Sequence, residues 1–326
     1  MDNVCHSLAG AVIAQAGFAR RLPRATLLAV VAANIPDVDA FAYVLGDPAF
    51  AVSFRRGWTH GLPALVMWIA LLAAGFAWWQ RARPRAASAR GAVPGEGSAR
   101  AYLPLAAIAV CSHPALDWMN TYGVRVLMPF SDRWFYGDTL FIVALVLIAS
   151  FGTGWFLSRR ALRAGSAHAE GPARVALTVV VAYLVAMKSM SAATLAAVRE
   201  RLAPADAGPR GAMVAPRPAS LFTRDVLVRR DSTYDHHTAR WTLRGLELSP
   251  LEGRTPIGDA PALRPAVMAN VDGERFLRWS RFPYFARLDV TPPAAFVGDV
   301  RYASGTEESW AGIRVRLAAP PGSGGR

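Results

Sequence analysis

The chain has 326 residues, of which 53% are hydrophobic and only 18% are charged. Soluble globular proteins carry roughly 25% charged residues, so this composition argues against an ordinary water-soluble domain. The formal net charge is +13, but the basic residues lie largely in short loops between apolar runs. That pattern indicates membrane topology, and we expect no nucleic-acid partner.

The apolar runs predict a helical membrane domain over residues 1–200. A bilayer core needs about 20 apolar residues per helix, so the sequence predicts five or six transmembrane helices, some of them broken and the first one short. The N-terminus lacks a basic region and a convincing cleavage site, so we keep the first run in the mature protein. The runs are 8–19, 25–46, 61–79, 101–119, 138–157 and 175–198.

The loop charges predict which side of the membrane each loop occupies. Residues 80–100 hold five arginines against one glutamate, and residues 158–174 hold four against one. Short basic loops stay in the cytoplasm, which places both loops and the Arg20, Arg21 and Arg24 cluster inside an inner (plasma) membrane. Loops 47–60 and 120–137, and the chain from about residue 205 onward, are then extracytoplasmic.

The C-terminal part has the alternating pattern of half-buried strands. We predict a linker over 201–214, a small mostly β domain over 215–318 and a disordered tail over 319–326. The sequence does not identify a protein partner for this domain. The predicted strands lie in the runs DVLVRRD, ARWTLRGLEL, ERFLRWSRFPYFARLDV and SWAGIRVRL.

The motif NIPDVD at residues 34–39 places two carboxylates inside an apolar run. Pro36 disfavours helical backbone at the preceding residue and removes a donor, so we expect the helix to break before it. In an extended or hooked segment residues two apart face the same way, which would bring Asp37 and Asp39 to one site. The alternative is that either carboxylate only caps a helix.

Further ligand-type residues lie toward the same, outer face of the membrane. His113 and Asp117 are four apart in HPALD, one helical turn, with Pro114 suited to a first turn. His6 and His60 add two imidazoles, although His6 could instead be a polar interfacial anchor, and His113 with Asp117 could be a helix-capping pair. Ionisable residues in membrane segments are costly and usually functional. The predicted metal ligands are His6, Asp37, Asp39, His60, His113 and Asp117.

This mixed nitrogen and oxygen set suits Zn²⁺ first, with Mn²⁺ or Fe²⁺ as alternatives, as one or two ions. A metal-activated water would be the nucleophile, and Asp37 or Asp39, if free of metal, the general base. We predict substrate contacts from Arg55, Arg56 and Asn120; the two arginines could equally be an interfacial basic pair.

Four motifs in order resemble the YdjM-type inner-membrane proteins, described as membrane-bound metal-dependent hydrolases. They are an N-terminal His before a small-residue helix, NIPDVD, RGWTH and SHPALDWMNTYG. The resemblance covers about residues 1–160 and implies a helical membrane domain carrying the metal site on the six residues named above. The order of ligands is also loosely similar to the zinc phospholipase C and nuclease class.

The leading hypothesis is a membrane-bound metal-dependent hydrolase of a phosphoester or ester, with membrane lipid as a candidate substrate. The alternative is a non-catalytic membrane binding or sensor protein with a structural metal and a partner-binding β domain. An ion transporter is disfavoured, since such proteins spread polar residues through the membrane depth.

Overall fold

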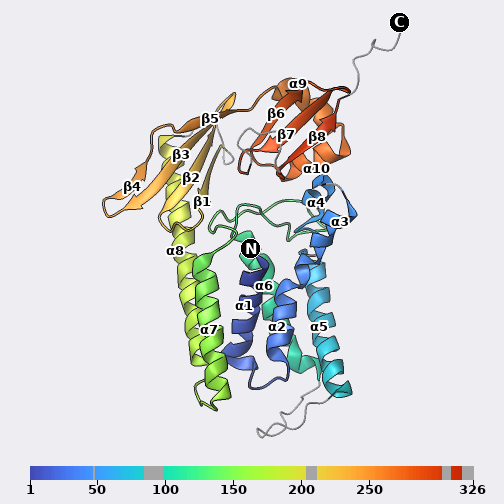
Figure 1. Cartoon of the computed structure of the whole chain (residues 1–326), viewed down its shortest axis with the longest axis vertical. Helices are drawn as coiled ribbons and strands as arrows, with labels where there is room; N and C mark the ends of the chain where they lie inside the picture. Colours follow the sequence, from blue (N-terminus) through green and yellow to red (C-terminus); the bar gives the residue numbers. More distant parts are fainter. Residues whose placement is uncertain (47, 84–97, 203–210, 303–309, 318–326) are drawn as a thin grey trace. The chain divides into compact units, whose positions relative to one another are not determined.

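The computed structural model describes residues 1–46, 48–83, 98–202, 211–302 and 310–317 (Figure 1). It divides into two compact units. The helical unit comprises Met1–Asp39 and Arg56–Met190, and the C-terminal unit comprises Ala40–Arg55 and Ser191–Arg326. The predicted loop 80–100, linker 201–214 and tail 319–326 lie largely or wholly outside the described residues.

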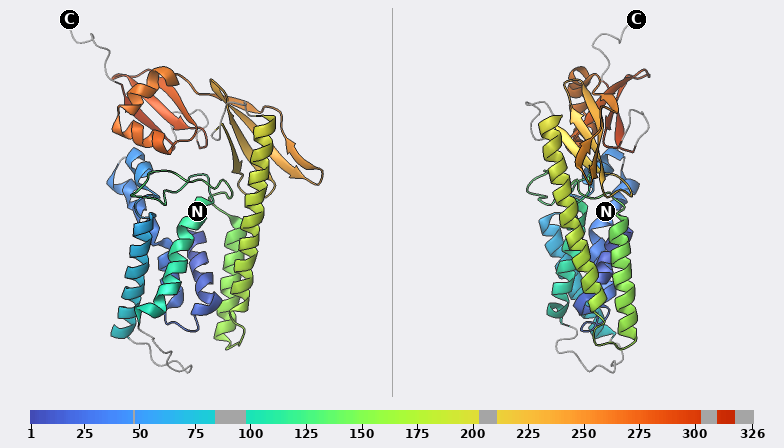
Figure 2. Two further views of the ribbon diagram at one scale, coloured as in Figure 1. Left: turned by 180° about the vertical axis from the view of Figure 1, so that it is seen from behind. Right: turned by 90° about the vertical axis from the view of Figure 1, so that its left-hand side faces the viewer.

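The helical unit is built from long helices that run side by side in the views of Figures 1 and 2. The short π-helix η1 (Ala14–Phe18) continues the first helix, and the 3₁₀-helix η2 (Ile35–Phe41) continues the second. The predicted span 138–157 becomes helical only at Leu145. The long helices are α1 (Asn3–Ile13), α2 (Ala25–Asn34), α5 (Leu62–Ala82), α6 (Ala99–Trp118), α7 (Leu145–Arg163) and α8 (Gly171–Arg201), whose last turns belong to the C-terminal unit.

Small residues let α1 and α2 approach closely. A Cβ atom at Gly10 would lie 2.3 Å from the carbonyl oxygen of Ala29 and 3.0 Å from the Cβ of Ala33. Only glycine fits this crossing, the kind of small-residue contact that draws helices together in membranes. The contact lies one turn beyond His6, so it also positions that imidazole.

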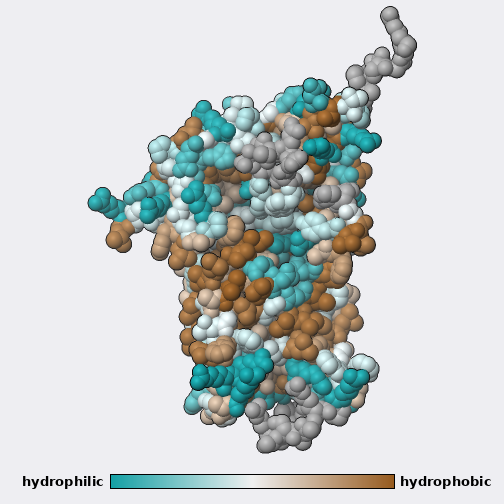
Figure 3. Space-filling model, in the orientation of Figure 1, coloured by the Kyte–Doolittle hydropathy of each residue, from teal (hydrophilic) through white to brown (hydrophobic). Residues whose placement is uncertain are grey.

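Within the described residues, three helical stretches are long and apolar enough to cross a membrane: Ala25–Leu45, Leu62–Ala82 and Gly171–Arg201. On the face drawn in Figure 3, hydrophobic side chains cover large areas of the helical unit. On α5 these include the exposed side chains of Val66 and Trp78. Exposed apolar helix faces of this size fit contact with lipid.

The C-terminal unit contains two antiparallel sheets. In the five-stranded sheet the order is β1-β2-β3-β4, with β5 also paired to β3; the three-stranded sheet has the order β6-β7-β8. The helix α4 (Pro48–Phe54) packs against α10 (Val271–Trp279). The remaining elements are α3 (Ala42–Leu45), α9 (Ala260–Met268), β1 (Ala212–Pro216), β2 (Thr223–Arg229), β3 (Thr233–Thr242), β4 (Gly245–Leu248), β5 (Gly253–Pro256), β6 (Pro283–Leu288), β7 (Ala294–Asp299) and β8 (Gly312–Arg316).

A helical region followed by a β-sheet domain is therefore confirmed, with one local error. The run ERFLRW, predicted as strand, is the second half of α10. Asn270 caps this helix, because its Oδ1 accepts hydrogen bonds from the amides of Asp272 and Gly273. Phe276 and Trp279 are both fully buried three residues apart, a helical spacing that the alternation argument overlooked.

A buried ion pair holds the three-stranded sheet to the preceding helix. Arg301 donates to both carboxylate oxygens of Asp299, at 2.9 and 3.0 Å, and its guanidinium lies 4.8 Å from the ring centre of Trp279. Burial opposes the charge on Asp299, but Arg301 and the hydroxyl of Ser280 outweigh it and lower the pKa of the carboxyl. This contribution to stability is present above the ordinary carboxyl range and is lost as the pH falls through the lowered pKa.

We expect Asp299→Asn to destabilise the C-terminal unit by about 3–5 kcal/mol, since it leaves the buried guanidinium of Arg301 without a counter-charge. Chemical denaturation of the purified protein followed by tryptophan fluorescence measures this. The matched control is Asp272→Asn, which breaks a half-exposed pair with Arg275 and should cost less than about 1 kcal/mol. Equal effects of the two substitutions would contradict the assignment.

Candidate metal centre

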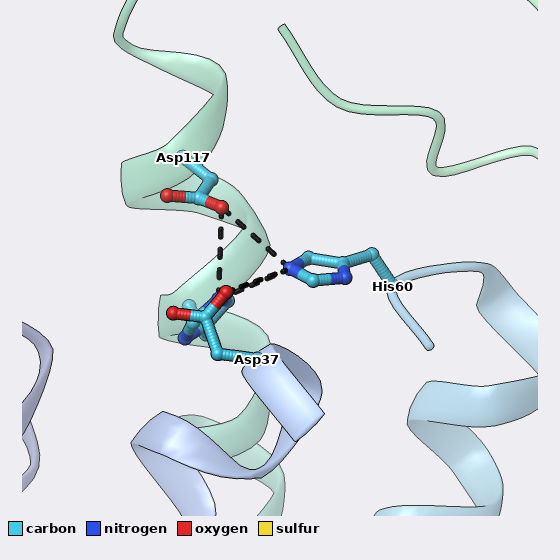
Figure 4. Close-up of side chains that lie close together, drawn as sticks. Asp37, His60 and Asp117 are labelled. Atoms are coloured by element: carbon cyan, nitrogen blue, oxygen red, sulfur yellow. Dashed lines mark hydrogen bonds and ion pairs between the residues drawn. The ribbon is translucent and has the colours of Figure 1, made fainter. Parts of the chain in front are cut away.

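Four ligand-type side chains from three separate segments converge in the helical unit. Asp37 lies on η2, His60 on the turn before α5, and His113 and Asp117 one turn apart on α6. One ligand atom from each lies within 4.8 Å of the others, and the two histidines and Asp117 are fully buried. Figure 4 shows Asp37, His60 and Asp117 pointing toward one another.

The distances between these atoms fit a single tetrahedral ion. Ligand atoms 2.0–2.2 Å from zinc lie about 3.3–3.6 Å from one another in a tetrahedron. The Nε2 atoms of His60 and His113 are 3.1 Å apart, and each lies 3.6 Å from Oδ2 of Asp117. Oδ1 of Asp37 lies 3.7 Å from Nε2 of His113 and 4.0 Å from Nε2 of His60. A bound ion would have to draw Asp37 closer to His60 and His113 by a few tenths of an ångström to complete the set.

In both imidazoles Nδ1 is engaged by a polar neighbour, so Nε2 is the nitrogen that faces the centre. Nδ1 of His113 lies 2.6 Å from the carbonyl oxygen of Ala33, which can only accept, so Nδ1 carries the proton. Nδ1 of His60 lies 2.9 Å from the hydroxyl of Thr59 and 3.3 Å from Oδ2 of Asp39. Both Nε2 atoms then direct lone pairs at each other and at two carboxylates, an arrangement that a cation stabilises.

The break in the second helix occurs where Pro36 predicts it, but the segment that follows is not extended. The helix α2 ends at Asn34, and η2 continues as a 3₁₀-helix. With three residues per turn, side chains two apart point about 240° from each other. The expectation that Asp37 and Asp39 face the same way was therefore wrong, and they approach His60 from opposite edges of its ring.

Asp39 lies behind His60, outside the group of four. Its Oδ2 accepts hydrogen bonds from the hydroxyl of Thr59 at 2.8 Å and from the backbone amide of Arg56 at 2.7 Å. A carboxylate that orients the distal nitrogen of a ligating imidazole is a recurrent support in metal sites. The structure thus places Asp39 as a positioning residue for His60.

Of the three predicted substrate-binding residues, Arg56 and Asn120 lie beside the centre, whereas Arg55 does not. Nε of Arg56 lies 3.0 Å from Oδ2 of Asp117, so this buried guanidinium borders the centre. Asn120 holds it there, because its Oδ1 accepts from Nη1 of Arg56 at 3.1 Å and from the amide of Tyr122 at 2.8 Å. Arg55 belongs to the C-terminal unit, where its guanidinium lies 5.2 Å from the ring centre of Tyr43.

His6 packs beside the centre and contacts it through Asp117. Its ring stacks on that of His113, with centroids 3.8 Å apart, and its Nε2 lies 3.3 Å from Oδ1 of Asp117. The amino group of Met1 contacts the same oxygen. No described residue gives Nδ1 of His6 a hydrogen bond, although the side chain is fully buried. Asp117 therefore turns one oxygen to the centre and the other to His6.

Sequence reasoning assigned no role to four polar neighbours of the site, Thr59, Asn3, Asn34 and Ser7. Thr59 links His60 to Asp39, and its place directly before His60 in the RGWTH motif was the available signal. Nδ2 of Asn3 donates to Oδ2 of Asp37 at 3.1 Å, and Nδ2 of Asn34 donates to the hydroxyl of Ser7 at 3.0 Å. For Asn3 no sequence pattern pointed to the site, since it begins a helix far from the other motifs.

We expect the purified protein to hold one divalent ion per chain, and His113→Ala to lose it, because Nε2 of His113 occupies one corner of the tetrahedron. Asp39→Asn should retain the ion with affinity about 10–100-fold weaker, the usual cost of losing an orienting partner. Elemental analysis and chelator competition measure both effects. The control His236→Ala, in the C-terminal unit, should bind like the parent, and ion loss in the control alone would refute the site.

Comparison with known proteins gave one match. The model of the family described as YdjM inner membrane protein matches residues 1–194, more than half of the chain and all of the candidate metal centre. The search of curated proteins and that of solved structures gave no match. The chain therefore belongs to the YdjM inner membrane protein family.

Proposed function

We propose that this protein is an inner-membrane, metal-dependent hydrolase of a phosphoester or ester substrate. The observation that carries the proposal is the donor set of two imidazoles and two carboxylates. Structural zinc sites are usually built from cysteine with histidine, whereas carboxylate-containing sets are typical of catalytic ones. Both cysteines lie outside this group, and zinc is the first candidate ion.

The residues around the centre have separable roles. A bound divalent ion would supply Lewis acidity and lower the pKa of a bound water. Arg56, fixed by Asp117 and Asn120, places a positive charge where a phosphoryl oxygen would gain negative charge. Asp37 is the one partly accessible member of the four, with a side chain 8% exposed. If His60, His113 and Asp117 hold the ion and Asp37 stays off it, water takes the fourth position and Asp37 is placed to accept its proton.

A polar strip on α1 and α2 supports access to Asp37 from the surface. Asn3 is exposed and Ser7 and Asn34 are half-buried, and their hydrogen bonds connect them to one another and to Asp37. On the face drawn in Figure 3, a hydrophilic patch lies between hydrophobic areas of the helical unit. Such a strip in a membrane-facing surface would suit the polar head of a lipid-like substrate that reaches the centre from the bilayer.

We propose that six helical segments cross the membrane, with the basic ends in the cytoplasm. Two contacts support this, since Nη1 of Arg20 donates to the carbonyl of Ala167 at 2.9 Å and Nη2 of Arg24 donates to that of Arg83 at 3.0 Å. Three basic loops thus meet at one end of the helical unit. Short basic loops stay inside, so the metal centre and the C-terminal unit would face outward.

One observation favours a second function. Three of the four ligand-type residues are fully buried, and a closed four-ligand site is how proteins hold a structural metal. In that case the protein would be a membrane binding or sensor protein, with the C-terminal unit contacting a partner. Partial exposure of Asp37 and the adjacent Arg56 lead us to rank this second.

We expect detergent-purified protein to hydrolyse at least one member of a panel of chromogenic phosphomonoesters, phosphodiesters and carboxylesters, and a chelator to abolish turnover. Asn34→Ala should keep the ion but lower kcat/KM about five- to tenfold, the loss expected for one hydrogen bond near the substrate. Turnover that survives removal of the ion would contradict the proposal. A protein that is inactive on the panel and unfolds with the chelator would support the structural-metal alternative.

We expect a reporter that works only outside the cytoplasm to be active when fused after Arg326, because the C-terminal unit follows an outward span. The same reporter inserted after Arg83 should be inactive, since this basic loop stays inside. Enzymatic activity of the two fusions at matched expression is the measurement. The reverse pattern would invert the proposed topology.

A further inference from the structure

The hairpin between β3 and β4 carries an exposed apolar tip. Its loop is Leu243 and Arg244, and the side chain of Leu243 is 109% exposed. Leu221 and Phe222, which precede β2, are 38% and 55% exposed. They lie beside the hairpin because the amide of Trp241 donates to the carbonyl of Phe222 at 2.9 Å. Three large apolar side chains thus share one end of the sheet.

The turn itself does not require a leucine. Two-residue hairpin loops prefer Asn, Asp and Gly, which tolerate the backbone and face water. Here the hydroxyl of Thr242 accepts from the amide of Arg244 at 3.2 Å and donates to the carbonyl of Gly245 at 3.1 Å, which holds the loop whatever its tip residue. The leucine at this exposed position is therefore not explained by the turn, and its apolar side chain suits contact with another apolar surface.

The hairpin is attached to a candidate membrane span. Nε1 of Trp241 donates to the hydroxyl of Thr194 on α8 at 2.9 Å, and Val198 packs in the same core cluster as Ala239. The hydrogen bond from Trp241 thus places the end of β3 against α8 one turn before Val198. In Figure 1 and the left view of Figure 2, the β3–β4 hairpin crosses the C-terminal part of α8, and its tip lies lower in the view than the end of that helix.

Helix length places this attachment near a bilayer surface. The span Gly171–Arg201 has 31 residues, about 46 Å at 1.5 Å per residue, whereas a hydrocarbon core is about 30 Å thick. The helix is therefore about ten residues longer than a span perpendicular to the bilayer. Thr194 lies seven residues before the end of α8, and Leu243 extends about 7 Å further back along the strand from Trp241.

The charges around the tip fit the same position. Arg240 and Arg244 are both exposed on the hairpin, and Arg199 and Arg201 form the basic last turn of α8. Apolar side chains flanked by arginines are typical of elements that lie at the headgroup boundary, where the apolar part enters the acyl region and the guanidinium groups bind phosphate.

We propose that the tip of the β3–β4 hairpin, formed by Leu221, Phe222 and Leu243, inserts into the bilayer surface next to α8. Arg240 and Arg244 bind lipid phosphates there. The hairpin anchors the five-stranded sheet to the membrane, independently of whether the metal centre is catalytic.

The test uses the full chain in nanodiscs of phosphatidylcholine and phosphatidylglycerol. Cys111→Ser removes the exposed thiol, and Cys5 is buried, so Leu243→Cys or Phe222→Cys carries a single environment-sensitive fluorophore. The matched control is Leu251→Cys, which is 43% exposed in the connection between β4 and β5, beside the middle of β3. Quenching by nitroxide-bearing lipid is compared with quenching by aqueous iodide.

We expect the labels at positions 243 and 222 to be quenched by nitroxide lipid about threefold or more strongly than the label at 251, and by iodide correspondingly less. Iodide quenching at 243 equal to that at 251 would show the tip in water and overturn the proposal. Protection of the tip labels from both quenchers would mean that protein covers it, which also overturns the proposal.

Discussion

The imidazole of His60 is the interaction on which the candidate site depends. Its Nε2 faces His113, Asp37 and Asp117, and its Nδ1 faces Thr59 and Asp39. One ring therefore ties together η2, the turn before α5, and α6, in a part of the helical unit where His60, His113 and Asp117 are fully buried. In a low-dielectric interior, buried carboxylates and lone pairs need compensating positive charge. Arg56 and the amino group of Met1 supply part of it at Asp117, and a cation bound between the four side chains would supply more.

The chain between two of the site motifs belongs to the other unit. It leaves the helical unit after Asp39 and returns at Arg56, and the backbone amide of Arg56 donates to Asp39 at 2.7 Å. This hydrogen bond joins the two residues that flank the inserted segment 40–55. The helix α4 of this segment packs on α10. The carboxylate that orients His60 thus also holds both ends of the insertion.

Several residues show which structural features could be predicted from sequence patterns and which could not. Pro36 correctly predicted the end of α2, because a missing amide and a restricted neighbour are local effects. The direction of Asp39 could not be predicted, since it depends on η2 being a 3₁₀-helix and on hydrogen bonds from Thr59 and Arg56. The strand predicted over ERFLRW failed for a related reason, because the Asn270 cap and burial of Phe276 and Trp279 outweighed alternation.

The sequence by itself determined the membrane class, the β-rich C-terminal part and the residue types of a candidate metal site. Hydropathy, the spacing of apolar residues and side-chain chemistry are properties of the local sequence and need no knowledge of the fold. Only the tertiary structure decided which of the six candidates form the group of four. Asp37, His60, His113 and Asp117 meet there, while His6 and Asp39 stand behind them. The physical reason is that coordination depends on where a side chain points, and helix crossings and hydrogen bonds between distant segments set that direction.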